Sequence, residues 1–293
     1  MGRWSDSVLI TRTALGMISQ DRAFLLVPLL SGLTIVALFA VFTVPWIALA
    51  LLTPGSVFNS GSPTLILLVL TYLVLYFASV FVGTFFTAAL VGMAWMKFDG
   101  QHPSVGDGIR FARQHLRKII LWSLFSATVG LLLRAISQRL GGIAGVLVGV
   151  IGGATWAVAT YFVIPVLVFE KQSTLGSVRR SASLFGQTLG RTILSNLLVA
   201  LIVIGVAVPA ILLIVVAVWA IVTGNILLAV ASGVLAIGLL VFAAVLASAL
   251  EGIIRTALYR YATTGAVVPG LVPRYYRTTG QPPMSPPAAP PPP

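Results

Sequence analysis

The sequence is poor in the residue types that usually carry chemistry. Its 293 residues include no cysteine, two histidines and six carboxylates, and only 8% are charged, against about 25% in soluble domains. The lack of cysteine excludes disulfides and thiolate metal sites. His102 and His115 stand near Asp99 and Asp107, but their spacing matches no metal-binding motif. We therefore predict no metal site and no cofactor.

Motifs for catalysis are also missing. The chain has no phosphate-binding loop, no nucleophile elbow and no paired carboxylates in an apolar setting. No carboxylate or histidine stands inside an apolar run, where proton-coupled transport usually needs one. Glu251 comes closest, and Arg255 four residues later predicts a local ion pair. We predict no catalytic residue, and no enzyme.

Long apolar runs are what the sequence has in quantity. Hydrophobic residues make up 58% of the chain, and several runs exceed the roughly 18 residues that mark a membrane span. We predict an all-α polytopic membrane bundle over residues 1–266, with six spans in three hairpins and cytoplasmic interfacial helices. The spans are expected at about 23–52, 64–96, 119–138, 143–169, 192–222 and 226–250.

The basic residues are distributed unevenly about these spans. Sixteen of the 18 Lys and Arg flank them on one side, and only Arg134 and Arg139 fall on the other. The positive-inside rule then places both termini in the cytoplasm. The net charge of +12 lies beside spans, so it favours an anionic lipid surface over nucleic acid. The excess of Arg over Lys, with abundant Ala, Gly and Val, indicates a GC-rich bacterial or archaeal genome, so we predict that the protein resides in a bacterial or archaeal cell (inner) membrane.

Three polar segments, each before a pair of spans, place apolar residues at helical spacing beside arginines. They are the N-terminal segment, Val105–Ile119 and Leu175–Leu189. Helices of this kind lie in the headgroup plane with their cations toward phosphate. The shared pattern Arg-x-Ala fits either three copies of one unit or three elbows that merely look alike, and the sequence leaves both open. The predicted headgroup contacts in the second and third segments are Arg110, Arg113, Arg117, Arg179 and Arg180.

Arg134 is predicted to reach the outer headgroups from the end of the third span. All six carboxylates lie on the inner side, so none can readily pair with it. A charge held in the bilayer core is costly. Snorkelling to lipid phosphate and water is favoured over contact with an anionic ligand.

Small residues recur at one face of the fourth run. Close approach to another helix explains such a face. Packing within the bundle is favoured over self-association of two chains. Trp156 and Pro165 of the same run are expected in the bundle interior, with Trp156 near the midplane and Trp122 at the inner interface. The four glycines are Gly141, Gly145, Gly149 and Gly153.

The end of the chain has another character. Ten of the 17 prolines fall within 267–293, which predicts a disordered, Pro-rich cytoplasmic tail.

Several stretches of sequence resemble a prokaryotic family of uncharacterised integral membrane proteins, a domain of unknown function. The resemblance covers about 5–270 and implies a membrane bundle without implying any activity. More remotely, the layout is similar to the membrane domain of some glycerophosphoryl diester phosphodiesterases. The stretches include Phe85-Phe86-Thr-Ala-Ala-Leu90, Pro103-Ser-Val-Gly-Asp-Gly108, Ala127-Thr-Val-Gly-Leu-Leu-Leu-Arg134, Pro165-Val-Leu-Val-Phe-Glu170 and Leu258-Tyr-Arg-Tyr-Ala-Thr-Thr-Gly265.

These observations favour a non-enzymatic membrane protein that interacts with lipid or anchors a partner. The alternative is a transporter or channel for a small hydrophobic or lipid-like substrate, because long spans interrupted by Pro permit a central site. The expected partners are the lipid bilayer, anionic lipid on the cytoplasmic side, and a second copy or another membrane protein, with no nucleic acid.

Overall fold

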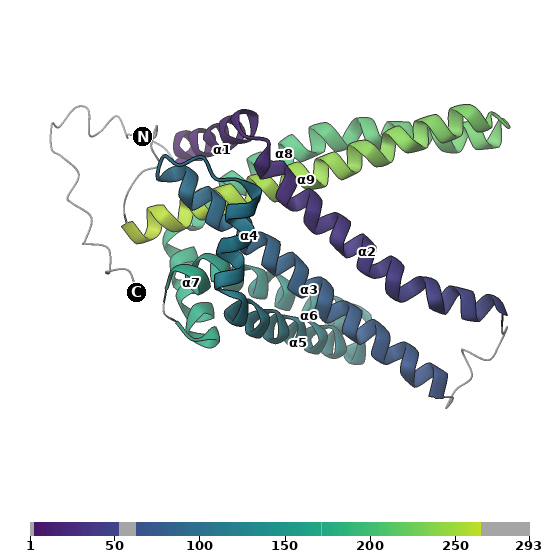
Figure 1. The fold of residues 1–293 in the computed structure, drawn as a ribbon, viewed down its shortest axis with the longest axis horizontal. Helices are drawn as coiled ribbons and strands as arrows, with labels where there is room; N and C mark the ends of the chain where they lie inside the picture. The colour runs from purple at the N-terminus through teal and green to yellow at the C-terminus, as the bar shows by residue number, and fades with distance from the viewer. Residues whose placement is uncertain (1–2, 53–62, 171, 265–293) are drawn as a thin grey trace. The chain divides into compact units, whose positions relative to one another are not determined.

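The computed structural model of the chain describes residues 3–52, 63–170 and 172–264, and Figure 1 shows these residues as helices joined by short turns. Within this part of the chain there are nine helices and no strand, which confirms the all-α class. Six segments are long and apolar enough to cross a membrane by length and composition. The helices are α1 (Arg3–Gln20), α2 (Ala23–Leu52), α3 (Pro63–Phe98), α4 (Val105–Gln114), α5 (Leu116–Leu140), α6 (Gly142–Thr160), α7 (Val163–Phe169), α8 (Thr174–Val222) and α9 (Ile226–Thr264).

The chain forms two compact units, and three long helices contribute to both. Helices α2, α3 and α8 each begin in one unit and end in the other. The first unit comprises Met1–Leu26, Met93–Pro103 and Leu184–Pro293, and the second comprises Val27–Gly92 and Ser104–Ser183.

In the first unit, α8 and α9 lie side by side as an antiparallel hairpin (Figure 1). The turn between them includes Gly224 with φ +76°, a left-handed conformation that glycine adopts without strain. Ala210, Ala236 and Ala243 are buried, and such small residues allow two helices to approach closely. Helix α1 packs on α9, with Ala14 and other apolar residues of α1 buried and Arg12 exposed.

In the second unit, α5 and α6 form another hairpin, and the short helices α4 and α7 both pack on α5. Gly141 and Gly142 make the turn of this hairpin with φ values of +59° and +48°. Gly141 therefore lies in the turn before α6 and not on the helix face where its spacing placed it.

The fourth predicted span is interrupted. Its residues form α6 and α7, with a break at Tyr161 and Phe162. Pro165 is the cause, because its ring clashes with the carbonyl of the residue four positions earlier and it has no N–H to donate. The helix restarts at Val163, which leaves Pro165 in the first turn, where no N–H is required.

The third interfacial segment is not a separate helix. Residues 174–222 form one continuous helix, α8, that includes the predicted fifth span. The only proline inside it is Pro209, so no proline ends the helix between the two predicted pieces. The second interfacial segment, predicted over Val105–Ile119, forms the separate helix α4 only as far as Gln114, because the helix is interrupted at His115 and α5 begins at Leu116. The predicted tail at 267–293 lies outside the described residues.

Candidate functional site

The arginines predicted to contact lipid headgroups all belong to the second unit: some lie on α5 and α8, and Arg110 and Arg113 lie on the short helix α4. A capping box begins this helix: Ser104 Oγ accepts a hydrogen bond from the backbone N–H of Asp107, and Asp107 accepts one from the backbone N–H of Ser104. Hydrogen bonds from the Ser104 hydroxyl and backbone, with the nearby Arg110 guanidinium, hold the pKa of Asp107 below its usual value. Arg110 lies 3.4 Å from Asp107 Oδ1, and its side chain is 75% exposed.

Phe111 holds α4 against the rest of the second unit. Its ring lies 5.6 Å from that of Phe169 at the end of α7. It also packs on the backbone of α3, where a Cβ added at Gly92 would come within 2.3 Å of the ring. Because Phe111 faces inward, its neighbours Arg110 and Arg113 are carried outward. Both are exposed.

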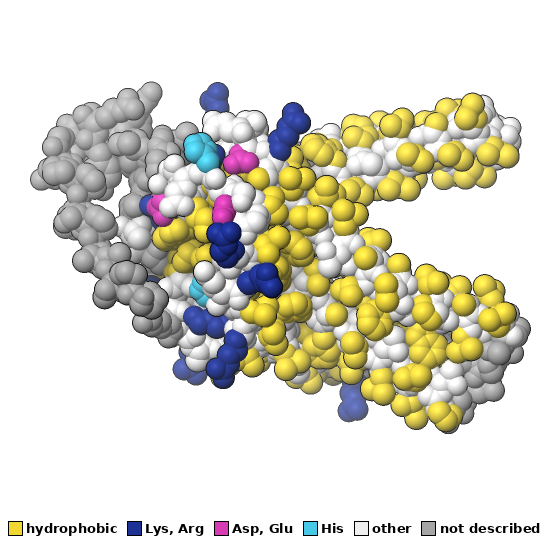
Figure 2. All heavy atoms as spheres, viewed as in Figure 1, with side chains coloured by type: hydrophobic (Ala, Val, Ile, Leu, Met, Phe, Trp, Pro, Cys, Tyr) yellow, Lys and Arg dark blue, Asp and Glu magenta, His cyan; other side chains and the backbone are white. Residues whose placement is uncertain are grey.

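Three of the predicted headgroup arginines are exposed and form no ion pair with a described residue. Arg113 and Arg117 flank the α4–α5 junction, and Arg179 lies near the start of α8. None of the three forms an ion pair with another residue in the described part of the chain. Figure 2 shows basic side chains gathered at helix ends, whereas hydrophobic side chains cover the helix lengths. These three guanidinium groups are therefore available to an external anion.

Arg180 differs from its neighbour Arg179. Its Nε lies 3.3 Å from Glu170 Oε1, and the two side chains are 40% and 21% exposed. Exposed pairs of this kind contribute about 0–1 kcal/mol. Arg180 therefore has part of its charge satisfied within the fold.

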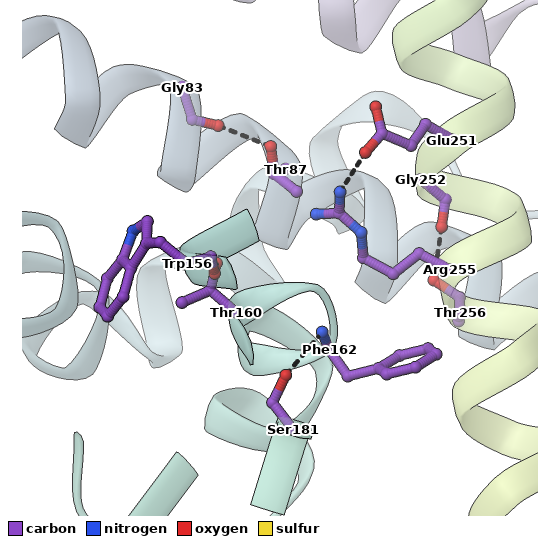
Figure 3. Close-up of polar contacts among 10 residues, drawn as sticks. All are labelled: Gly83, Thr87, Trp156, Thr160, Phe162, Ser181, Glu251, Gly252, Arg255 and Thr256. Atoms are coloured by element: carbon purple, nitrogen blue, oxygen red, sulfur yellow. Dashed lines mark hydrogen bonds and ion pairs between the residues drawn. The ribbon is translucent and has the colours of Figure 1, made fainter. Parts of the chain in front are cut away.

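The break between α6 and α7 has its own polar contacts. The backbone N–H of Phe162 donates to Ser181 Oγ over 2.9 Å, and Ser181 is fully buried (Figure 3). Pro165, predicted in the interior, is buried in α7. A hydroxyl from α8 thus satisfies a backbone donor that the interrupted helix leaves without a partner.

The other end of α7 is contacted by Lys118. Its Nζ donates to the carbonyl oxygen of Leu167 at 2.8 Å and to that of Glu170 at 3.1 Å. A helix leaves its last carbonyls without intrahelical partners, and a cation near them is favourable. Lys118 comes from the first turn of α5, so it joins α5 to the end of α7.

Trp156 stacks on Trp122, with ring centroids 6.1 Å apart and planes 15° from parallel. Phe125 lies 6.0 Å from the same Trp156 ring. The sequence had placed Trp122 and Trp156 at different depths. They meet because α5 and α6 run antiparallel from the turn at Gly141 and Gly142, which brings a residue early in α5 beside one late in α6.

The four glycines have different surroundings. A Cβ at Gly145 would lie 2.3 Å from the carbonyl oxygen of Ser137 in α5, and one at Gly149 would lie 2.9 Å from Ser137 Oγ. A Cβ at Gly153 would meet nothing within 4 Å. The close approach within the hairpin therefore centres on Gly145 and Gly149, and Ser137 donates a hydrogen bond to the Gly145 carbonyl.

Arg134 is exposed on α5 and forms no ion pair with any described residue. Its predicted contact with outer headgroups stays a prediction. Among the described residues, no group of three His, Asp or Glu could hold a metal ion.

The first unit has its own ion pairs, which join three of its carboxylates to cations. Lys97 lies 3.6 Å from Asp21, and Arg260 lies 2.7 Å from Asp99 and over the ring of Trp95 at 5.1 Å. The predicted pair of Glu251 with Arg255 is confirmed (Figure 3). With the two pairs of the second unit, five of the six carboxylates contact a cation, and the sixth, Asp6, has an undescribed side chain.

Sequence reasoning missed Lys118, Ser181 and Phe111. Lys118 was one basic residue among several in its segment, and Phe111 was one apolar residue of an amphipathic stretch. Neither position distinguished the residue from many others on a protein surface. Pro165 did signal a helix break, but the sequence could not show which side chains would satisfy the freed backbone groups.

These features define a multi-pass α-helical membrane protein with exposed arginines on α4, α5 and α8 and an interrupted span. The chain belongs to a family of unknown function (DUF6159), whose model matches residues 63–268. The match begins at α3, so α1 and α2 lie outside it, although the resemblance in the sequence was expected to start near residue 5. No curated protein and no solved structure matches the chain. The remote likeness to phosphodiesterase membrane domains stays a prediction.

Proposed function

We propose that this chain is a non-enzymatic membrane protein that binds anionic lipid headgroups on the cytoplasmic face of a bacterial or archaeal cell (inner) membrane. The observation that carries the proposal is that the guanidinium groups of Arg113, Arg117 and Arg179 are exposed and form no ion pair within the described part of the chain. Arginine matches the phosphate group with planar, bidentate donors.

The contrast with the neighbouring cations supports this assignment. Arg110, Lys118 and Arg180 already contact a carboxylate or carbonyls of the chain. The three unpaired arginines have no such partner among the described residues, so an external phosphate would not compete with an existing contact. Each cation near an anionic leaflet contributes about 1 kcal/mol.

The test replaces Arg113, Arg117 and Arg179 together by Gln in the full chain, purified in detergent. Short-chain phosphatidylglycerol is titrated and binding is followed by microscale thermophoresis. Loss of three contacts at about 1 kcal/mol each should weaken binding by about 100-fold. The effect should shrink at high salt because exposed charges are screened.

Arg110→Gln is the matched control on α4, the helix that also carries Arg113, because Asp107 already pairs with Arg110. It should weaken binding much less than the triple variant. Phosphatidylcholine and inorganic phosphate, titrated in the same way, separate the lipid from its charge. Equal binding of phosphatidylglycerol and phosphatidylcholine, or no effect of the triple variant, would contradict the proposal.

A second candidate function is the transport of a small hydrophobic or lipid-like substrate. The break between α6 and α7 supports it, since discontinuous helices often form transport sites. Faster transbilayer movement of a fluorescent lipid in vesicles that contain the protein would favour this candidate.

A further inference from the structure

The C-terminal end of α7 presents two backbone carbonyls to one cation. Leu167 lies in the last turn of α7, and Glu170 follows the helix with extended backbone angles, φ −106° and ψ 150°. The Nζ of Lys118 donates to both carbonyl oxygens, at 2.8 and 3.1 Å. One ammonium group thus bridges two acceptors separated by the end of a helix.

These carbonyls need a partner because α7 is enclosed. Every residue from Val163 to Val168 is buried. A carbonyl withdrawn from water without a hydrogen bond costs free energy, and both carbonyl contacts with Lys118 are partly buried. The dipole of the helix adds partial negative charge at this end, which favours a cation over a neutral donor.

We propose that the Leu167 and Glu170 carbonyls form a monovalent-cation site that Lys118 fills with its own tethered ammonium. Carbonyls at the end of an interrupted helix are groups that bind free cations in transporters. Here the side chain from α5 supplies the charge, so α7 stays docked on α5 without a free ion. Lys118 is a positioning residue of α7 in this arrangement.

Arg117 provides an internal comparison, because it precedes Lys118 in the chain and has the same charge. Arg117 is exposed and forms no ion pair with any described residue, whereas Lys118 is half-buried and contacts α7. The two residues should therefore have opposite roles. Arg117 should affect lipid binding with little effect on stability, and Lys118 should affect stability with little effect on lipid binding.

The experiment measures thermal unfolding of the full chain in detergent by tryptophan fluorescence, to which Trp122 and Trp156 of the same unit contribute. Lys118→Ala should lower the Tm by about 5 °C or more, since buried acceptors lose a charged donor. Methylammonium should restore at least half of this loss. Tetramethylammonium at equal ionic strength should not, because it has no N–H to donate.

Arg117→Ala is the matched control, and its Tm should stay within about 1 °C of wild type with or without methylammonium. If Lys118→Ala does not accumulate, Lys118→Met keeps the aliphatic length and loses only the ammonium, and it should melt below Lys118→Arg. Wild-type stability of Lys118→Ala or Lys118→Met, or equal recovery with both ammonium salts, would overturn the proposal. Phosphatidylglycerol binding by Lys118→Met reports separately on the proposed function.

Discussion

At the residue scale, the described cations divide by what they contact. Arg110, Arg180, Arg255 and Arg260 pair with carboxylates, and Lys118 contacts two backbone carbonyls. Other arginines, such as those proposed to bind lipid, face outward without an ion pair among the described residues. Charge alone made these groups look alike in the sequence. Their separation depends on which acceptors the fold places within reach.

Asp107 offers a pH-dependent test of the α4 cap. Its pKa is lowered in the folded chain by hydrogen bonds from Ser104, so its contribution to stability is present above the unfolded pKa of about 3.9. That contribution is lost as the pH falls through the folded pKa. At pH 7, Asp107→Asn should lower the Tm by about 1–2 °C through the weakened cap.

The measurement compares the Tm of wild type and Asp107→Asn between pH 6 and pH 3. Other carboxylates titrate equally in both proteins, so only the difference between the two curves reports on Asp107. This difference should shrink toward zero in acid. A difference that stays constant over the whole range would show that the Asp107 charge does not stabilise the cap.

At the element scale, the structure differs from the sequence prediction mainly in where helices end and which helices contact one another. Pro165 ends α6 early and creates α7, whereas no proline interrupts α8 before Pro209. The sequence predicted the spans by hydrophobicity, and the apolar run at 143–169 was predicted as one continuous span although Pro165 stands within it. Pro165 was visible in the sequence. The side chain that accepts a hydrogen bond from the backbone at the break, Ser181, could not be identified there.

The α5–α6 hairpin gives a prediction with a matched control on one helix. Gly145→Ala should destabilise the protein by about 2 kcal/mol or more, because its Cβ would lie 2.3 Å from a backbone carbonyl that cannot rotate away. Gly153→Ala adds a Cβ in open space, and should be neutral or stabilising by up to about 1 kcal/mol through helix propensity.

Denaturant unfolding in detergent measures both substitutions, and size-exclusion chromatography with light scattering follows the oligomeric state. Equal stability of the Gly145→Ala and Gly153→Ala proteins would contradict the close contact with Ser137. A change of oligomeric state in Gly153→Ala alone would point to self-association through the part of α6 that does not face α5.

At the scale of the whole molecule, hydrophobic side chains cover long stretches with few charged side chains among them (Figure 2). In the second unit, the basic α4–α5 junction and the exposed Arg134 lie at different positions along α5. The positive-inside rule predicts an orientation from the sequence, with the α3–α4 connection in the cytoplasm and the α8–α9 turn outside.

The absence of cysteine makes this orientation directly measurable, because a single introduced thiol has no background. Thr223→Cys, in the α8–α9 turn, should react with a membrane-impermeant maleimide in intact cells. Gln101→Cys, in the exposed α3–α4 connection, should react only after the membrane is opened. The reverse pattern would overturn the predicted topology. It would also overturn the proposed position of Arg113, Arg117 and Arg179 at the cytoplasmic leaflet.

The sequence alone determined the class of protein and the approximate positions of the six long apolar helices. Hydrophobic runs specify membrane spans because a helix is the structure that satisfies its own backbone inside lipid. It also determined the local pair of Glu251 and Arg255, since four residues along a helix bring two side chains to one face. These properties depend on neighbours in the chain.

Only the tertiary structure decided which residues act across helices. Lys118 meets the end of α7, Ser181 meets the break at Phe162, and Gly145 meets Ser137 because the fold brings separate segments together. Hydrophobic patterns specify which side of a helix is apolar, but they do not specify its partner or register. The role of a single lysine or arginine follows from that partner, and therefore from the fold.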